Sequence, residues 1–406
     1  MSSNQSEKPL SLAKRSSNNV RKELWSVWWT ALKLGLTSFG GPIAHLGYFH
    51  ETYVIRKKWL DEKSYADLVA LCQFLPGPAS SQVGIGIGAM RAGVIGAIIA
   101  WLGFTLPSVL FLISFAYMIN SFDVSSSGWL YGLKLVAVAV VAQAVLGMSS
   151  KLATGRLRAS LAFGSLAAVL LWQVPWIQVA VIVVAGLVGM LFIKQDRPLE
   201  ILGQSIRIGY KTGLLFLLLF VTLLIGLPIA RLFLENEWIA IMDSFYRTGS
   251  LVFGGGHVVL PLLETETMLN EWMSKEDFIA GYGAAQAVPG PLFTFAAYLG
   301  VLIQGIPGAV LAVLAVFLPG FLLVIGAMPF WNHLRSNVKL QGAMIGMNAA
   351  VVGILFAALY DPIWTSSITS TTEFIVASGL FVLLVLWKLP PWLVVVVGAL
   401  AGYLFL

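Results

Sequence analysis

Long apolar stretches constrain this chain more than any other feature of its sequence. A helix needs about 20 apolar residues to cross the hydrocarbon core of a bilayer. Only 11% of the residues are charged, whereas soluble domains carry about 25%. The sequence therefore predicts an all-α polytopic membrane protein with the lipid bilayer as its solvent. Clear spanning helices are predicted at 92–119, 129–149, 159–173, 175–193, 213–234, 307–330, 340–360, 374–388 and 391–406.

The chain also repeats itself, at an offset that falls from 214 to 212 residues along the sequence. The matching pairs are Gly35 and Gly249, Phe39-Gly40-Gly41 and Phe253-Gly254-Gly255, Trp59 and Trp272, Gln73 and Gln286, Pro76-Gly77-Pro78 and Pro289-Gly290-Pro291, and Pro107 and Pro319. An ordered series of this kind is hard to obtain by chance, so a two-fold repeat is indicated. We divide the chain into a tail (1–24), a first repeat (25–193), a linker with one connecting transmembrane helix (194–238) and a second repeat (239–406).

Charged residues in the loops predict that the two repeats have opposite orientations. Loop 50–65 has four basic and three acidic residues, whereas its counterpart 264–277 has one basic and five acidic residues. Because basic residues mark cytoplasmic loops, these equivalent loops are expected on opposite sides of the membrane. Inverted repeats of this kind are common in secondary transporters. The basic tail contains no signal-peptide pattern, so we expect it to be retained in the cytoplasm.

Four further apolar segments are broken at their centres by glycine or proline. They are 25–49, 66–90, 239–263 and 277–303. Each could be a re-entrant hairpin or a fully crossing broken helix. Hairpins are favoured, because they keep the basic tail and the basic loop 50–65 on one side. Irregular backbone at membrane depth is tolerated where it is buried in protein or lines a wet cavity, so the breaks are candidate walls of a site.

The breaks predict a site for an anion. A helix that starts after a break presents unpaired N–H groups and the positive end of its dipole. The alternative is a purely structural kink whose hydroxyl and amide side chains bond back to the local backbone. The candidate binding residues at the breaks are Phe39, Gly40, Gly41, Pro42, Gln73, Pro76, Gly77, Pro78, Ser80 and Ser81 in the first repeat, and Gly254, Gly255, Gly256, Gln286, Pro289, Gly290, Pro291 and Thr294 in the second.

Lys33 and Arg247 each precede a Phe-Gly-Gly break by six residues. A cation within an apolar segment costs about 2.5–3.5 kcal/mol on insertion scales, so the matched pair suggests two charges for a divalent anion. The alternative is that each cation reaches the membrane interface or pairs with a carboxylate. Asp243 lies four residues before Arg247 and could pair with it on one helix face. Proton coupling could involve His45, His257 or Asp243, although a histidine in a membrane also serves as a hydrogen-bonded packing residue.

Several classes of function receive no support from the sequence. The basic residues lie in short loops between apolar segments, so the net charge of +6 does not indicate nucleic acid. P-loop, zinc-protease and serine-nucleophile motifs are absent, and four scattered histidines do not suggest a metal site. Cys72 is the only cysteine and is expected to be a small buried side chain. We therefore expect neither an enzyme nor a cofactor.

The motifs of both halves resemble the chromate ion transporter family in its two-domain long form. They are Phe39-Gly40-Gly41-Pro42, Trp59-Leu60, Gln73 through Pro78, Phe253 through His257, and Gln286 through Pro291. The resemblance covers nearly the whole chain from about residue 25. It implies a multi-pass protein of the bacterial inner membrane that exports chromate, in competition with sulfate. It also implies that the membrane potential or the proton gradient drives export.

Together these features predict a secondary active transporter of a small oxyanion such as chromate or sulfate. A passive anion channel and a transporter of another inorganic oxyanion are the main alternatives. A membrane enzyme acting on lipid and a structural subunit are weaker ones. The sequence leaves the oligomeric state open, a homodimer included.

Overall fold

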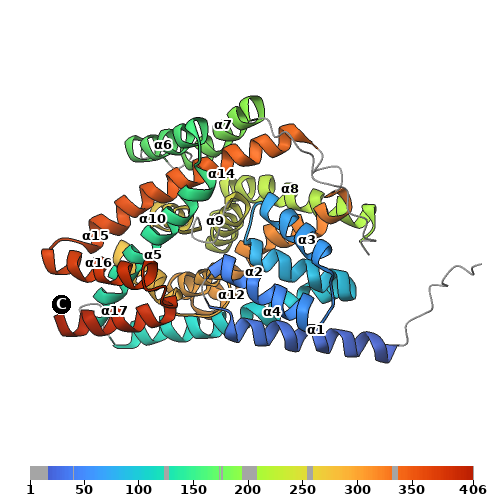
Figure 1. Cartoon of the computed structure of the whole chain (residues 1–406), viewed down its shortest axis with the longest axis horizontal. Helices are drawn as coiled ribbons and strands as arrows, with labels where there is room; N and C mark the ends of the chain where they lie inside the picture. The colour runs from blue at the N-terminus through green and yellow to red at the C-terminus, as the bar shows by residue number, and fades with distance from the viewer. Residues whose placement is uncertain are drawn as a thin grey trace, which may run out of the picture.

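The computed structural model describes residues 17–39, 41–122, 128–172, 174, 177–193, 208–253, 259–331 and 337–405, and every regular element in these ranges is a helix (Figure 1). The α-helices are α1 (Ser17–Thr37), α2 (Gly41–Phe49), α3 (Glu62–Phe74), α4 (Ala79–Phe122), α5 (Gly128–Leu152), α6 (Arg156–Leu171), α7 (Ile177–Phe192), α8 (Tyr210–Phe233), α9 (Glu237–Leu251), α10 (Val259–Leu269), α11 (Lys275–Ala285), α12 (Phe295–Ala327), α14 (Val338–Ala358), α15 (Thr365–Ser367), α16 (Thr371–Val385) and α17 (Pro391–Phe405). Shorter π and 3₁₀ helices are η1 (His50–Arg56), η4 (Leu292–Thr294), η5 (Met328–Phe330) and η6 (Leu359–Trp364).

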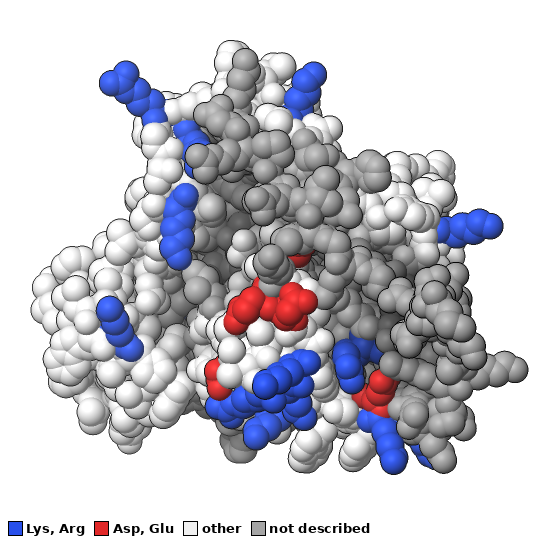
Figure 2. Space-filling model, turned by 45° about the vertical axis from the view of Figure 1, so that its right-hand side comes forward, with Lys and Arg blue, Asp and Glu red and all other residues white. Residues whose placement is uncertain are grey.

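The described helices have the length and surface of a membrane protein. Five stretches of them are long and apolar enough to cross a bilayer, namely Ala79–Ile119, Gly128–Leu152, Tyr210–Phe233, Leu292–Phe330 and Val338–Ser367. Helix α8 exposes most of its leucines, and Leu232 is 82% exposed. Figure 2 shows broad areas of surface without charged side chains. A water-soluble protein would bury such surface, so the predicted all-α membrane fold is confirmed.

The chain leaves the helical conformation at each predicted break. Helix α1 ends before Phe39, α3 before Pro76, α9 before Phe253 and α11 before Pro289. Gly77 and Gly290 have φ angles of 121° and 95°. These angles lie in the region that glycine adopts without a steric penalty, and the flanking prolines cannot donate a helical hydrogen bond. The helix breaks therefore follow from the local sequence.

Helices α4 and α12 each consist of two antiparallel arms. The chain reverses at Gly93 (φ 66°) and at Gly305 (φ 61°), which are 212 residues apart. Residues 88 and 96 would be about 12 Å apart along a continuous helix, yet a Cβ atom on Gly88 would overlap the carbonyl oxygen of Gly96. The arms are 79–91 and 94–122 in α4, and 295–303 and 306–327 in α12. The turn at Gly305 falls between the predicted segments 277–303 and 307–330, and the turn at Gly93 lies at the very start of the predicted span 92–119.

The broken helices of the first repeat return to the end of the molecule from which they start. The Arg91 guanidinium lies 5.0 Å from the centre of the Trp59 ring and 3.9 Å from the Glu23 carboxylate. Arg91 ends the first arm of α4, Trp59 lies in the loop after η1, and Glu23 lies near the start of α1. In the second repeat, Gln304 donates to Glu237 in the equivalent place. The arms thus have the geometry of hairpins, while their entry into the bilayer from one side stays a prediction.

Equivalent helices pack in the same way in the two repeats. In the first repeat α1 lies along the second arm of α4 (Figure 1), and a Cβ atom on Gly35 would lie 2.6 Å from the carbonyl oxygen of Phe104. In the second repeat α9 lies along α12, and a Cβ atom on Gly249 would overlap the carbonyl oxygen of Val316. Close backbone approach through small residues is the usual way in which helices associate in lipid.

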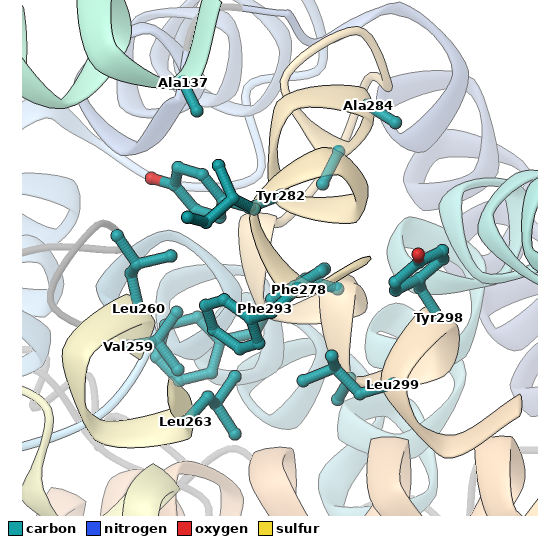
Figure 3. Packing of buried hydrophobic residues seen from close by; sticks show 14 of the residues in the cluster. Ala137, Val259, Leu260, Leu263, Phe278, Tyr282, Ala284, Phe293, Tyr298 and Leu299 are labelled. Carbon is teal, nitrogen blue, oxygen red and sulfur yellow. The ribbon is translucent and has the colours of Figure 1, made fainter. Parts of the chain in front are cut away.

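An aromatic core surrounds the breaks of the second repeat. Figure 3 shows Tyr282 and Phe278 of α11 and Phe293 of η4 gathered with Leu260 and Leu263 of α10. Tyr282, Phe278 and Phe293 are no more than 1% exposed. Such large, fully buried side chains give the irregular backbone around residues 286–291 a rigid setting.

Gly249→Ala should destabilise the protein by about 1–3 kcal/mol, because the added methyl group meets a backbone oxygen that cannot rotate away. The measurement is the thermal unfolding temperature of purified protein in detergent micelles. Gly226→Ala is the matched control, since nothing lies within 4 Å of a Cβ atom there. Alanine at that position should leave stability unchanged or raise it by up to about 1 kcal/mol. Equal stability of the two variants would contradict the proposed close contact between α9 and α12.

Candidate functional site

Two backbone hydrogen bonds tie the breaks of the two repeats together. The N–H of Gly77 donates to the carbonyl of Val252 (2.7 Å), and the N–H of Gly290 donates to the carbonyl of Ser38 (2.8 Å). Ser38 and Val252 directly precede the two Phe-Gly-Gly motifs. Each Pro-Gly-Pro break therefore binds the Phe-Gly-Gly break of the other repeat. Exchanging the repeats exchanges the two bonds, as a two-fold relation requires.

Each Pro-Gly-Pro break also rests on the long arm of the opposite repeat. Ser108 Oγ, on the second arm of α4, donates to the Pro289 carbonyl. A Cβ atom on Gly77 would lie 3.2 Å from the Cα atom of Gly320 on α12. Gln82 Nε2 donates to the carbonyls of Pro76 (2.9 Å) and Gly320 (3.3 Å). The Pro289 carbonyl thus finds its donor across the repeat interface, whereas the Pro76 carbonyl accepts from its own repeat through a glutamine that also binds α12.

Six side chains at or beside these contacts bury a polar atom that has no hydrogen-bond partner among the described residues. We call them the break cluster: Ser38 Oγ, His45 Nε2, Ser81 Oγ, Gln82 Oε1, Thr105 Oγ1 and Gln286 Nε2. All except Gln286 are no more than 2% exposed. A buried polar atom without a partner costs about 1–3 kcal/mol. A concentration of them in one place is therefore a reason to expect water or a polar ligand there.

The break cluster is asymmetric although the backbone is repeated. The positions equivalent to Ser38, His45, Gln82 and Thr105 in the second repeat are Val252, Val259, Phe295 and Phe317. Thr294 matches Ser81, but its hydroxyl donates to the Pro291 carbonyl at 2.7 Å. The first repeat therefore provides mostly polar side chains and the second repeat mostly apolar ones at these positions.

Sequence reasoning missed Ser38, Gln82, Thr105 and Ser108. It searched the repeats for shared residues, whereas these residues stand where the repeats differ. A polar residue opposite an apolar residue at an equivalent intramembrane position is the signal that could have found them.

The predicted residues at the breaks fall into different environments. His45 Nδ1 lies 3.3 Å from Ser80 Oγ, and both side chains are buried. Gln73 is exposed, whereas Gln286 is half-buried. The N–H groups of Gly77 and Gly290 are bonded to carbonyls, so the N–H groups open to a ligand are those at the starts of the following helices. Gly40, Gly254, Gly255, Gly256 and His257 lie outside the described residues.

Lys33 and Arg247 do not form the expected pair of free positive charges for an anion. Lys33 lies on the exposed side of α1, opposite the buried Ala31 and Leu34. Arg247 contacts Asp243 (3.0 Å) on the same helix and Glu266 (2.8 Å) on α10. The positions equivalent to Asp243 and Glu266 in the first repeat are Trp29 and Thr52, which cannot pair with a lysine. Equivalent cations therefore have unlike surroundings.

Arg247 belongs to a network of four charged groups, which we call the ion-pair network. Arg231 of α8 lies 3.2 Å from Asp243 and donates to Ser244 and Asn270. Ser244 donates to Glu266 at 2.8 Å. Two arginines and two carboxylates give a formal charge of zero, so Arg247 offers no free charge in this conformation. Sequence reasoning found Asp243 but missed Arg231 and Glu266, which come from neighbouring helices.

Comparisons with known proteins agree with this architecture. The family model described as chromate transporter matches residues 25–190 and again 239–403, so the two-repeat organisation is confirmed. No solved structure matches the chain.

Curated relatives cover nearly the whole length. A probable chromate transport protein of Synechococcus elongatus is 26% identical over 92% of this chain and 93% of its own. An uncharacterized transporter of Methanocaldococcus jannaschii is 29% identical over 94% of each chain. A chromate transport protein of Pseudomonas aeruginosa is 27% identical over 92% of this chain and 90% of its own. The resemblance seen in the sequence is thus confirmed, and this chain belongs to the chromate transporter family.

Proposed function

We propose that this protein is a secondary active transporter that exports a small oxyanion across the bacterial inner membrane. Chromate is the first candidate and sulfate the second. Family membership and the name of the Pseudomonas aeruginosa relative support chromate. We assign the N-terminus to the cytoplasm from its basic residues. The break cluster carries the proposal, because its buried polar atoms lack partners where the helix breaks meet.

The break cluster offers a tetrahedral anion directional donors. The hydroxyls of Ser81 and Thr105 can each donate one hydrogen bond, and the Gln286 amide, which lies beside the Tyr282 hydroxyl, has two N–H groups of which one can be donated to a ligand. Helices α2 and α4 begin directly after breaks, so their first N–H groups add donors and positive dipole ends. Gln82 already donates to two carbonyls, so we assign it a positioning role. Helix ends and hydroxyls, rather than the expected pair of cations, would then bind the anion.

Export of a dianion can draw on the membrane potential without ATP. Moving one elementary charge through 100 mV is worth about 2.3 kcal/mol, and a dianion gains about twice that when it leaves a negative interior. Alternating access would come from rocking one repeat against the other about the two cross-repeat hydrogen bonds. His45, His257 and Asp243 remain the candidates for proton exchange, and Glu266 joins them because it shares Arg247 with Asp243.

Flux of labelled chromate and sulfate into and out of proteoliposomes tests the function. We expect movement of the anion against its gradient when a voltage or a pH gradient is imposed. Movement that only dissipates the anion gradient would favour a passive channel. Absence of flux for both anions under every gradient would refute the proposed cargo.

Thr105→Val and Ser81→Ala should impair transport without loss of stability. Each removes a hydroxyl that has no partner within the described protein, so folding loses no hydrogen bond. Loss of a hydrogen bond to a charged ligand is worth about 1.5–3 kcal/mol, and the KM for the anion should rise about tenfold or more. Initial flux rates and thermal unfolding are measured together.

Ser114→Ala is the control for these two variants, because Ser114 is an exposed serine on the same helix. Its flux should match that of the parent. Unchanged KM in both Thr105→Val and Ser81→Ala would remove the break cluster from the binding site.

Arg247→Gln and Lys33→Gln should behave differently although the positions are equivalent. Arg247→Gln leaves the buried Asp243 and Glu266 with one arginine and should destabilise the protein by about 3 kcal/mol. Lys33→Gln changes an exposed side chain and should alter stability by less than about 0.5 kcal/mol. Thermal unfolding in detergent and anion flux are the readouts. If both variants lost flux at unchanged stability, the earlier charge-pair hypothesis would be favoured instead.

A further inference from the structure

We propose that a cavity beside the first Phe-Gly-Gly break is a vestibule that collects the oxyanion before it reaches the break cluster. This inference rests on the proposed function and adds a second anion site to it. The cavity has a volume of about 570 Å³ and is bounded by residues of both repeats. Its first-repeat wall comes from Phe39, α2 and α5, and its second-repeat wall from the end of α16 and the start of α17.

The inner end of the cavity adjoins the break cluster. Phe39 lines the cavity, and its neighbour Ser38 accepts the hydrogen bond from Gly290 and carries one of the unpartnered hydroxyls. Along α5 the lining runs from Gln143 to Ser150, next to the exposed Lys151 at the helix end. The cavity therefore lies along the last two turns of α5 and reaches the first Phe-Gly-Gly break at Phe39.

The charge of the lining favours an anion. Among the described residues that line it, Lys388 is the one formally charged side chain and none is a carboxylate. The backbone of Lys388 has φ of 55°, which is uncommon for a lysine. One hydrogen bond on each side holds this turn. Trp387 N–H donates to the Val382 carbonyl, and Leu389 N–H donates to the Leu383 carbonyl. Lys388 is exposed, and a cation that lines a low-dielectric cleft raises the local concentration of anions.

Two polar side chains of α5 line the cavity together with Lys388. Ser150 and Gln143 lie on one face of α5, and the Gln143 amide makes one long contact of 3.4 Å with the Leu384 carbonyl. That contact leaves amide donor capacity for a ligand. The remaining lining is mostly apolar, so an anion would be held weakly and would pass on, as a vestibule requires.

An aromatic pair lines the vestibule where it adjoins the first Phe-Gly-Gly break. The rings of Phe39 and Trp392 have centroids 6.2 Å apart. Phe39 belongs to the first repeat and Trp392 to the second, so rocking of the repeats would part the two rings. We infer that this pair is the lid between the vestibule and the central site.

Cysteine labelling tests whether the cavity is an aqueous anion path. Cys72 is the only native cysteine and is 0% exposed, so the parent protein provides a silent background. Gln143→Cys and Ser150→Cys are placed separately and treated in membrane vesicles of either orientation with membrane-impermeant anionic and cationic methanethiosulfonates. Thr154→Cys, which is exposed in the loop after α5, is the control outside the cavity. Sulfate is the protecting anion, because chromate oxidises thiols.

We expect both cavity cysteines to react from one side of the membrane, with the anionic reagent reacting faster than the cationic one. Millimolar sulfate should slow labelling at Gln143→Cys but not at Thr154→Cys. Lys388→Gln should reduce the preference for the anionic reagent about tenfold and raise the KM for flux without changing kcat. Lys151→Gln, a neighbouring lysine outside the lining, should do neither.

Other outcomes separate this inference from the proposed function. Reaction of the cavity cysteines only with a lipid-soluble maleimide would show a lipid groove and overturn the vestibule, even if oxyanion flux is intact. The same holds if Lys388→Gln leaves both the reagent preference and the KM unchanged. Anion-selective labelling in a protein that moves neither chromate nor sulfate would keep the vestibule and refute the proposed cargo.

Discussion

Inside a bilayer, a backbone group that leaves a helix has no water to bind, so every break must find its partners within the protein. This chain has four such breaks. Two of them are satisfied by one reciprocal pair of hydrogen bonds, from Gly77 to Val252 and from Gly290 to Ser38. The repeats therefore depend on each other, because each supplies the acceptor that the other repeat's Pro-Gly-Pro turn needs. The meeting of the breaks in the interior follows from this requirement.

The backbone contacts are repeated in the two halves, whereas the polar side chains of the break cluster stand where the two halves differ. Gly35 and Gly249, and the turns at Gly93 and Gly305, preserve the same backbone contacts in both halves. The side chains of the break cluster differ between the halves, with hydroxyls and a histidine in the first repeat and valine or phenylalanine at most of the equivalent positions of the second. A polar wall opposite an apolar wall suits a ligand that must be recognised and then released, because full polar enclosure would hold a dianion too tightly.

The charged groups also differ between the two repeats. The ion-pair network joins α8, α9 and α10, and thereby fastens the two arms on either side of the third break. The first repeat has no equivalent carboxylates, and the hairpin with Lys33 is not fastened in this way. Ion pairs thus hold together the two arms around the third break but not those around the first break. The two halves therefore have unequal freedom to rearrange. In a protein that alternates between two forms, ion pairs made in only one form stabilise that form relative to the other.

The sequence by itself determined the membrane class, the helical fold, the positions of the breaks, the repeat and the family. These properties depend on local composition, on the backbone limits of glycine and proline, and on motifs that survive as strings of residues. Only the tertiary structure decided that Arg247 is neutralised by Glu266 while Lys33 is exposed, and that Thr105 and Ser108 face the breaks. A side chain's surroundings depend on helices that are distant in sequence, so two equivalent residues can have different roles. That information lies in the packing of helices against one another, which no local pattern contains.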